Sequence, residues 1–128
     1  MYLTIDKFSS EPIYLQIRSQ IVSAIANGQL AQGDALPSVR EMARDLGVNL
    51  HTVNKAYATL QDDGYAMMNG RKGTIVCVPN HAADSQQFQD IQNRTLAALS
   101  QLATEYRASG GSVQDFVALA KRAVEEGE

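Results

Sequence analysis

Two segments in the middle of the chain repeat the same helical spacing of apolar residues. Positions i, i+3, i+4 and i+7 lie on one face of an α-helix, so each segment predicts a short amphipathic helix. Ser38 followed by Glu41 is typical of a capping box, and Gly47 suits the end of the first helix. Two helices joined by a glycine-containing turn predict a helix-turn-helix. The apolar positions are Val39, Met42, Ala43 and Leu46, then Val53, Ala56, Tyr57 and Leu60.

A further helix is predicted before this pair. Pro12 suits the first turn of a helix, and Gly28 ends the pattern. Residues 28 to 37 then predict a glycine-rich connector whose two leucines anchor to the core. Residues 1 to 10 alternate apolar and polar positions and predict a short extended arm or edge strand. The apolar positions of this helix are Tyr14, Ile17, Ile21 and Ile25.

Two apolar stretches that flank Asn69-Gly70 predict a β-hairpin over residues 65 to 78. Asn-Gly between strand-like stretches is typical of a tight hairpin turn. Arg71 and Lys72 follow the turn and put two positive charges at the hairpin tip. A hairpin in this place indicates a wing, whose tip would meet the phosphate backbone or the minor groove of DNA.

The C-terminal part predicts two more helices. Asp84 or Ser85 caps a helix that ends near Ala108, and Ser112 caps the last one. Two helices of this size bury little surface alone, so we expect them to pack against a symmetric partner subunit. Packing onto the N-terminal part of the same chain is the alternative, and the polar linker at about residues 79–83 makes it the less favoured one. The apolar residues predicted to make the contact between subunits are Phe88, Ile91, Leu99, Leu102, Phe116 and Val117.

The residues at these positions resemble the GntR family of winged helix-turn-helix regulators. The matching motifs extend over residues 11 to 79. They include Pro12-Ile13-Tyr14, Gln16-Ile17, Leu36-Pro37-Ser38, Leu46-Gly47-Val48, Thr52-Val53 and Ala56-Tyr57. Asn49, with Thr52-Val53 and Lys55-Ala56-Tyr57 after it, is similar to the YtrA subfamily in particular.

The predicted fold is mainly α with a small β wing. A winged helix-turn-helix domain over residues 1–79 is followed by a short two-helix dimerisation region over residues 84–128. The resemblance implies a homodimeric transcription regulator that binds double-stranded DNA at an inverted repeat. Repression is the commoner mode of the family, and the resemblance to YtrA suggests control of transporter operons.

The net charge of −3 is low for a DNA-binding protein, but it is unevenly distributed. Residues 1–80 carry seven basic and seven acidic side chains, whereas residues 81–128 carry four and seven. The local arrangement of basic side chains must therefore supply the positive surface. We expect a moderate, salt-sensitive affinity for DNA. The zero charge of the N-terminal domain also favours an alternative, a winged-helix module that binds protein and has lost affinity for DNA.

Exposed polar side chains of the helix-turn-helix are the candidates for DNA contact. The resemblance implies that Arg40 contacts phosphate or guanine, and position favours His51 and Asn54 for contacts to bases. Lys55 is a candidate phosphate contact, because an ammonium acts as a point charge. Ser38 caps a helix whose N-terminus suits phosphate. The remaining candidates are Arg44, Asn49, Thr52, Tyr57, Gly70, Arg71 and Lys72.

Some candidates have a structural alternative. The Tyr57 ring lies on the core face, Asn49 suits the cap of the second helix, and Arg44 is equally a surface charge. The family usually has a glycine at the position of Arg71, so this departure argues against a close approach of the backbone to the minor groove, and an arginine side chain in a narrow groove is the alternative. Leu50 replaces an arginine of some family branches, so their operators cannot be transferred to this chain.

Other function classes find little support. The two histidines, His51 and His81, stand without a paired carboxylate or nucleophile, so an enzyme, a metal site or a cofactor is not expected. Cys77 is expected to be an inert core thiol, with redox sensing as the minor alternative. No membrane-spanning apolar run or signal peptide is recognisable, which predicts a cytoplasmic protein. A small-molecule effector of unknown identity would sit at the dimer interface or near the linker.

Overall fold

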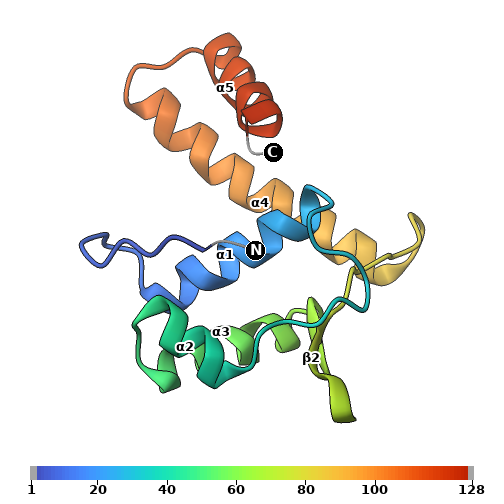
Figure 1. Ribbon diagram of the computed structural model, residues 1–128. Helices are drawn as coiled ribbons and strands as arrows, with labels where there is room; N and C mark the ends of the chain where they lie inside the picture. The colour runs from blue at the N-terminus through green and yellow to red at the C-terminus, as the bar shows by residue number, and fades with distance from the viewer. Residues whose placement is uncertain (1–2, 127–128) are drawn as a thin grey trace. The chain divides into compact units, whose positions relative to one another are not determined.

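The computed structural model describes residues 3–126 and divides into two compact units between Pro79 and Asn80 (Figure 1). The first unit holds three helices and a two-stranded antiparallel hairpin, and the second holds two helices. This architecture confirms the predicted mainly α fold with a small β wing. The elements are α1 (Ile13–Ala26), α2 (Val39–Leu46), α3 (Leu50–Asp62), β1 (Ala66–Asn69), η1 (Gly70–Lys72), β2 (Gly73–Val76), α4 (Gln86–Ala108) and α5 (Val113–Glu126).

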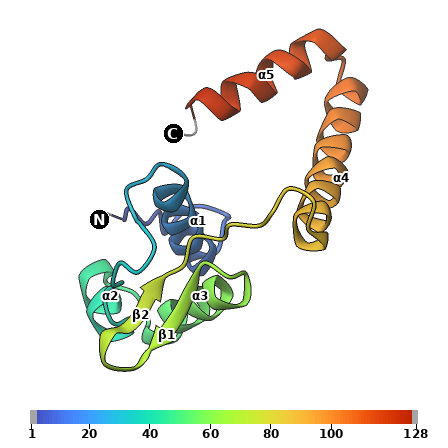
Figure 2. The same cartoon turned by 90° about the vertical axis from the view of Figure 1, so that its right-hand side faces the viewer.

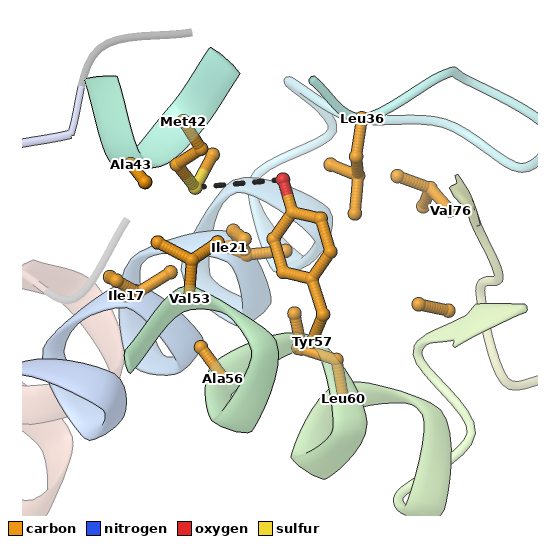
Figure 3. Close-up of a cluster of buried hydrophobic side chains, with 11 residues drawn as sticks. Ile17, Ile21, Leu36, Met42, Ala43, Val53, Ala56, Tyr57, Leu60 and Val76 are labelled. Atoms are coloured by element: carbon orange, nitrogen blue, oxygen red, sulfur yellow. Dashed lines mark hydrogen bonds between the residues drawn. The ribbon is translucent and has the colours of Figure 1, made fainter. Parts of the chain in front are cut away.

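The core of the first unit lies where α1 and α2 pack against α3. Figure 3 shows side chains from these helices, from the connector after α1 and from β2 meeting around the ring of Tyr57. Burying each aliphatic side chain contributes about 1.5–3 kcal/mol. The predicted apolar face of α3 is confirmed, because all four of its residues are buried. The largest side chains with no appreciable exposure are Ile17, Ile21, Val53, Leu60 and Val76.

Local caps fix the ends of α2 and α3 as predicted. The Ser38 hydroxyl accepts a hydrogen bond from the Glu41 amide at 3.1 Å, and the Glu41 carboxylate accepts one from the Ser38 amide at 3.4 Å. Gly47 ends α2 with a φ of 67°, a left-handed conformation that costs glycine little. The Asn49 side chain then caps α3 by accepting from the His51 amide at 2.8 Å. The helix-turn-helix geometry is therefore set by residues within and next to its own turn.

The hairpin of the wing forms where predicted, with its turn directly after Asn69. Asn69 pairs with Gly73 as the last rung of the ladder, so a three-residue 3-10 turn joins β1 and β2 (Figure 2). Asn69 thus ends the first strand and Gly70 begins the turn. Gly70 and Gly73, with φ values of 37° and 70°, take the left-handed conformations on either side of Arg71 and Lys72. A tight two-residue turn would have needed positive φ at Asn69, whose φ is −132°.

Side chains rather than a strand hold the N-terminal arm. Among residues 3–10 no strand forms, and the predicted arm gives way to a turn and bend at residues 7–10. The Gln16 side-chain amide donates a hydrogen bond to the Asp6 carbonyl and accepts one from the Asp6 amide, and Gln20 does the same with Thr4. These four hydrogen bonds are 2.7–2.9 Å long. A glutamine amide offers the same donor and acceptor as a peptide group, so it replaces a neighbouring strand.

The connector after α1 lies against the wing. Leu36 is buried in the core, as predicted, and its amide donates to the Thr74 carbonyl at 2.9 Å. The neighbouring Ala35 forms an isolated antiparallel bridge with Ile75. Cys77 follows β2 and is only half-buried, so the expectation of a core thiol is wrong. It lies one residue beyond the paired strand, where the hairpin leaves the core.

The second unit is an open pair of helices. The Ser85 and Ser112 hydroxyls cap them, accepting from the Phe88 and Asp115 amides at 3.1 and 3.0 Å. The Tyr106 and Phe116 rings lie 5.8 Å apart between the helices. None of the described residues of α4 and α5 is buried. The residues predicted for dimerisation are half-exposed or exposed in the single chain: Phe88, Ile91, Leu99, Leu102, Phe116 and Val117.

Candidate nucleic-acid interface

Helix α3 separates a buried apolar face from an exposed polar one. Val53 and Leu60 are fully buried and fix the rotation of the helix about its axis. That rotation leaves His51, Asn54 and Lys55 exposed. Three of the predicted DNA-contact residues thus stand together on the solvent side of the second helix of the helix-turn-helix, with no acidic residue between them.

The start of α2 presents a second exposed set. Ser38 and Arg40 are exposed, and Arg40 makes no ion pair within residues 3–126. Arg44 is also exposed and lies 3.8 Å from Asp45, a separation at which a solvated pair contributes little. Both arginines therefore keep their charge available. The Glu41 carboxylate is engaged in the capping box rather than in an ion pair with a basic side chain.

A groove of about 550 Å³ separates α3 from the wing. Ser38 and Asn54 line it from the two helices, and Thr74 lines it from β2. Asp62 lies at the same groove and adds a negative charge. This groove therefore brings together three predicted DNA contacts, Ser38, Asn54 and Tyr57, but it is not uniformly positive.

A second hollow of about 600 Å³, which we name the α1–α3 cleft, lies between the first turns of those helices. Its walls carry Tyr14 from α1 and His51, Thr52 and Lys55 from α3, together with Pro12 and Ile13. No carboxylate of residues 3–126 lines it. The Lys55 Nζ atom lies 4.1 Å from the centroid of the Tyr14 ring, within the range of a cation–π contact.

Tyr57 also lines the groove beside the wing, but its side chain is almost entirely buried. It is 2 % exposed, and its hydroxyl donates to the Pro37 carbonyl at 2.7 Å and lies 3.5 Å from the Met42 sulfur (Figure 3). Burial, and secondarily the charge of Glu41, raise the pKa of Tyr57 well above its ordinary value. The prediction that this hydroxyl donates to DNA is therefore corrected. Its proton is already donated to Pro37, the residue before Ser38, and this bond joins α3 to the start of α2.

The wing tip is exposed at Gly70, Arg71 and Lys72. Neither basic side chain makes an ion pair within the part of the chain that the structure describes. The short 3-10 turn puts two positive charges on adjacent residues at the end of the hairpin. Such a tip has the chemistry to meet a phosphate backbone.

The sequence patterns did not single out two side chains that tertiary contacts bring to this surface. The Lys7 ammonium donates to the Gly47 carbonyl at 3.4 Å, in the turn between α2 and α3. The helical spacing predicts only a core position for Tyr14 on α1, yet Tyr14 also lines the α1–α3 cleft. No spacing in the sequence links either residue to the helix-turn-helix, so only the folded chain reveals them.

Within residues 3–126, no three His, Cys, Asp or Glu side chains come together as a metal-binding group. In the same part of the chain, every helix is too short or too polar to cross a lipid bilayer.

Comparison with protein families identifies the first unit. The family model described as bacterial regulatory proteins, gntR family, matches residues 13–76. The HTH-type transcriptional regulator Rv1152 of Mycobacterium tuberculosis is 35% identical over 75 residues, which are 59% of this chain and 62% of that protein. The HTH-type transcriptional repressor YtrA of Bacillus subtilis is 40% identical over 74 residues, 58% of this chain and 57% of the repressor. The chain thus matches less than two thirds of the length of these relatives.

Solved structures share the fold. A transcriptional antiterminator from Listeria monocytogenes EGD-e superposes with a TM-score of 0.87 at 27% identity, over 99% of this chain and 92% of the other. YtrA from Sulfolobus acidocaldarius, a GntR-family transcription factor, gives 0.56 at 42% identity over 74% and 97%. AraR(DBD) in complex with operator ORE1 gives 0.50 at 26% identity over 60% and 94%.

Proposed function

Because the chain belongs to the gntR family of bacterial regulatory proteins, with YtrA proteins among its relatives, we propose that it is a sequence-specific DNA-binding repressor. We further propose that it acts as a homodimer on an inverted-repeat operator. The observation that carries the proposal is the division of α3 into a buried apolar face and an exposed face with His51, Asn54 and Lys55. The similarity to AraR(DBD), which was solved with its operator, supports the same use of this domain.

In this proposal α3 enters the major groove of DNA, and side chains at the start of α2 and at the wing tip contact the DNA on either side of it. Asn54 offers an amide that can pair with N6 and N7 of adenine, a contact worth about 1–3 kcal/mol of discrimination. Arg40 and the Ser38-capped start of α2 face the phosphates or a guanine. Arg71 and Lys72 extend the contact at the wing tip, where an arginine side chain can enter a narrow minor groove.

The homodimer is supported by the apolar surface of the second unit. Leu102 and Val117 are 57 % and 60 % exposed, and Leu96 and Val113 are 64 % and 61 % exposed. Leaving so much apolar surface in water is unfavourable, and a symmetric partner offering the same surface would bury it. Two linked α3 helices would then contact two half-sites. An effector would act by changing their separation, because half-site spacing is set by the dimer geometry.

Selection from a random double-stranded DNA library at physiological salt tests the proposal. The wild-type protein should enrich an inverted repeat, and Arg40→Ala should lose or degrade it. Arg94→Ala serves as the matched control, since it removes an exposed arginine from α4 and leaves the helix-turn-helix intact. A folded wild-type protein that enriches no sequence, or an Arg40→Ala variant that enriches the same repeat equally well, would contradict the proposal.

A second candidate function is a winged-helix module that binds protein. The balanced charge of residues 1–80, with seven basic and seven acidic side chains, favours it. The two functions differ in their response to salt. DNA affinity that falls steeply between 50 and 200 mM salt, as counterion release requires, would exclude this alternative.

A further inference from the structure

We propose that Tyr14 is a positioning residue for DNA binding. Its ring holds the Lys55 ammonium at the α1–α3 cleft, where the ammonium meets a phosphate of the DNA backbone. This inference rests on the proposed function, because it concerns how one part of that surface takes up phosphate. It adds to the interface a residue that itself makes no contact with a base.

The contact joins two elements that are fixed by the core. Tyr14 lies in the first turn of α1, and its half-buried ring packs against the buried cluster. Lys55 lies on the exposed face of α3. The distance of 4.1 Å between the Lys55 Nζ atom and the ring centroid is well inside the limit of about 6 Å for attraction between a cation and an aromatic face. An otherwise flexible side chain is therefore directed toward α1.

The charge around this contact favours an anion as the ligand. The cleft has Lys55 and His51 on its wall and a hydroxyl from Thr52, and none of the described residues that line it is a carboxylate. None of the ion pairs formed within residues 3–126 includes Lys55. The ring takes up one side of the ammonium through its π face and leaves N–H groups free to donate. The groove beside the wing, by contrast, includes Asp62 and is a poorer place for phosphate.

Holding the side chain in advance would strengthen the contact. A free lysine loses conformational freedom when it is ordered against a phosphate, and this loss weakens binding. A ring that already restricts Lys55 removes part of that loss before DNA arrives. From the usual strength of exposed cation–π contacts, the ring should raise DNA affinity by about two- to fivefold.

Substitutions at the two positions test the proposal, with affinity for the selected DNA measured as a function of salt. Lys55→Gln should weaken binding and lower the salt slope by about 1. Tyr14→Leu should weaken binding by about two- to fivefold, whereas Tyr14→Phe, which keeps the ring, should bind as the wild type does. The double variant Tyr14→Leu/Lys55→Gln should bind no more weakly than Lys55→Gln alone, because the ring acts through the lysine.

Three results of these substitutions would overturn the inference. Equal weakening by Tyr14→Phe and Tyr14→Leu would mean that the hydroxyl itself contacts DNA. Additive losses in the double variant would mean that Tyr14 acts on the fold rather than on Lys55. If Tyr14→Leu leaves the affinity for DNA unchanged, this inference alone is refuted. If the wild-type protein shows no salt-dependent DNA binding, the proposed function is refuted as well.

One measurement needs no substitution and so does not depend on a variant that folds. In the NMR spectrum of the free wild-type protein, the Lys55 methylene protons next to the ammonium should be shifted upfield by the Tyr14 ring. The corresponding protons of Lys72, at the exposed wing tip, provide the reference. Identical shifts for the two lysines would show that the contact is absent and would overturn the proposal.

Discussion

Removing the Tyr57 hydroxyl tests how the helix-turn-helix is held together. In Tyr57→Phe the ring stays in the core, but the 2.7 Å hydrogen bond to the Pro37 carbonyl is lost. The net contribution of such a hydrogen bond to the free energy of unfolding is about 0.5–1.5 kcal/mol. The Pro37 carbonyl that loses its donor is partly buried. We therefore expect the free energy of unfolding to fall by about 1 kcal/mol at pH 7. The loss should be felt at the start of α2, because Pro37 directly precedes the Ser38 cap.

The same hydroxyl predicts that the stability advantage of wild type over Tyr57→Phe is lost at high pH. Burial raises the pKa of Tyr57 in the folded protein above the ordinary value of about 10, so the folded state keeps the proton. The unfolded state releases it above pH 10, and wild-type stability then falls as pH rises. With the folded state still protonated, this loss reaches about 1.4 kcal/mol at pH 11. The advantage of wild type over Tyr57→Phe should therefore be full at pH 7 and disappear near pH 11.

Urea unfolding followed by circular dichroism at pH 7, 10 and 11, at equal protein concentrations, would measure both effects. Tyr65→Phe is the matched control, because the half-buried Tyr65 lies next to Arg18 and its hydroxyl has no hydrogen-bond partner within residues 3–126. We expect that control to change stability at pH 7 by no more than about 0.5 kcal/mol. A Tyr57→Phe variant as stable as wild type at pH 7, or a difference that does not shrink between pH 7 and 11, would refute the reasoning.

Three further predictions concern the cap and the DNA contacts. Ser38→Ala removes the acceptor for the Glu41 amide and should lower the free energy of unfolding by about 1 kcal/mol in urea; no change would mean that the capping box contributes nothing. Asn54→Ala should relax the base preference at one operator position in a repeated library selection, and equal losses on specific and random DNA would remove Asn54 from the base contacts. Lys72→Ala should weaken all DNA about equally and lower the salt slope by about 1 in binding titrations, so an unchanged slope would place the wing tip away from phosphate.

Local chemistry explains why so much of the fold was predictable. The bounds of α2 follow from the Ser38 cap and the left-handed backbone of Gly47, and the start of α3 follows from the Asn49 cap. Helical spacing of apolar residues then decides which face of α3 is buried and therefore which side chains are exposed. For the same reason the exposure of His51 and Asn54 could be predicted, although their contacts with DNA stay predictions.

Contacts between distant parts of the chain decided the rest. The Tyr57 hydroxyl finds its acceptor 20 residues away, and Lys7 reaches a carbonyl 40 residues away. Spacing within one helix carries no information about such partners, because they depend on how separate elements pack. The length of the wing turn also depends on strand pairing. Because the register of β1 and β2 pairs Asn69 with Gly73, three residues form the turn between them. The sequence by itself determined the helices and their faces, whereas only the tertiary structure placed Lys55 over the ring of Tyr14.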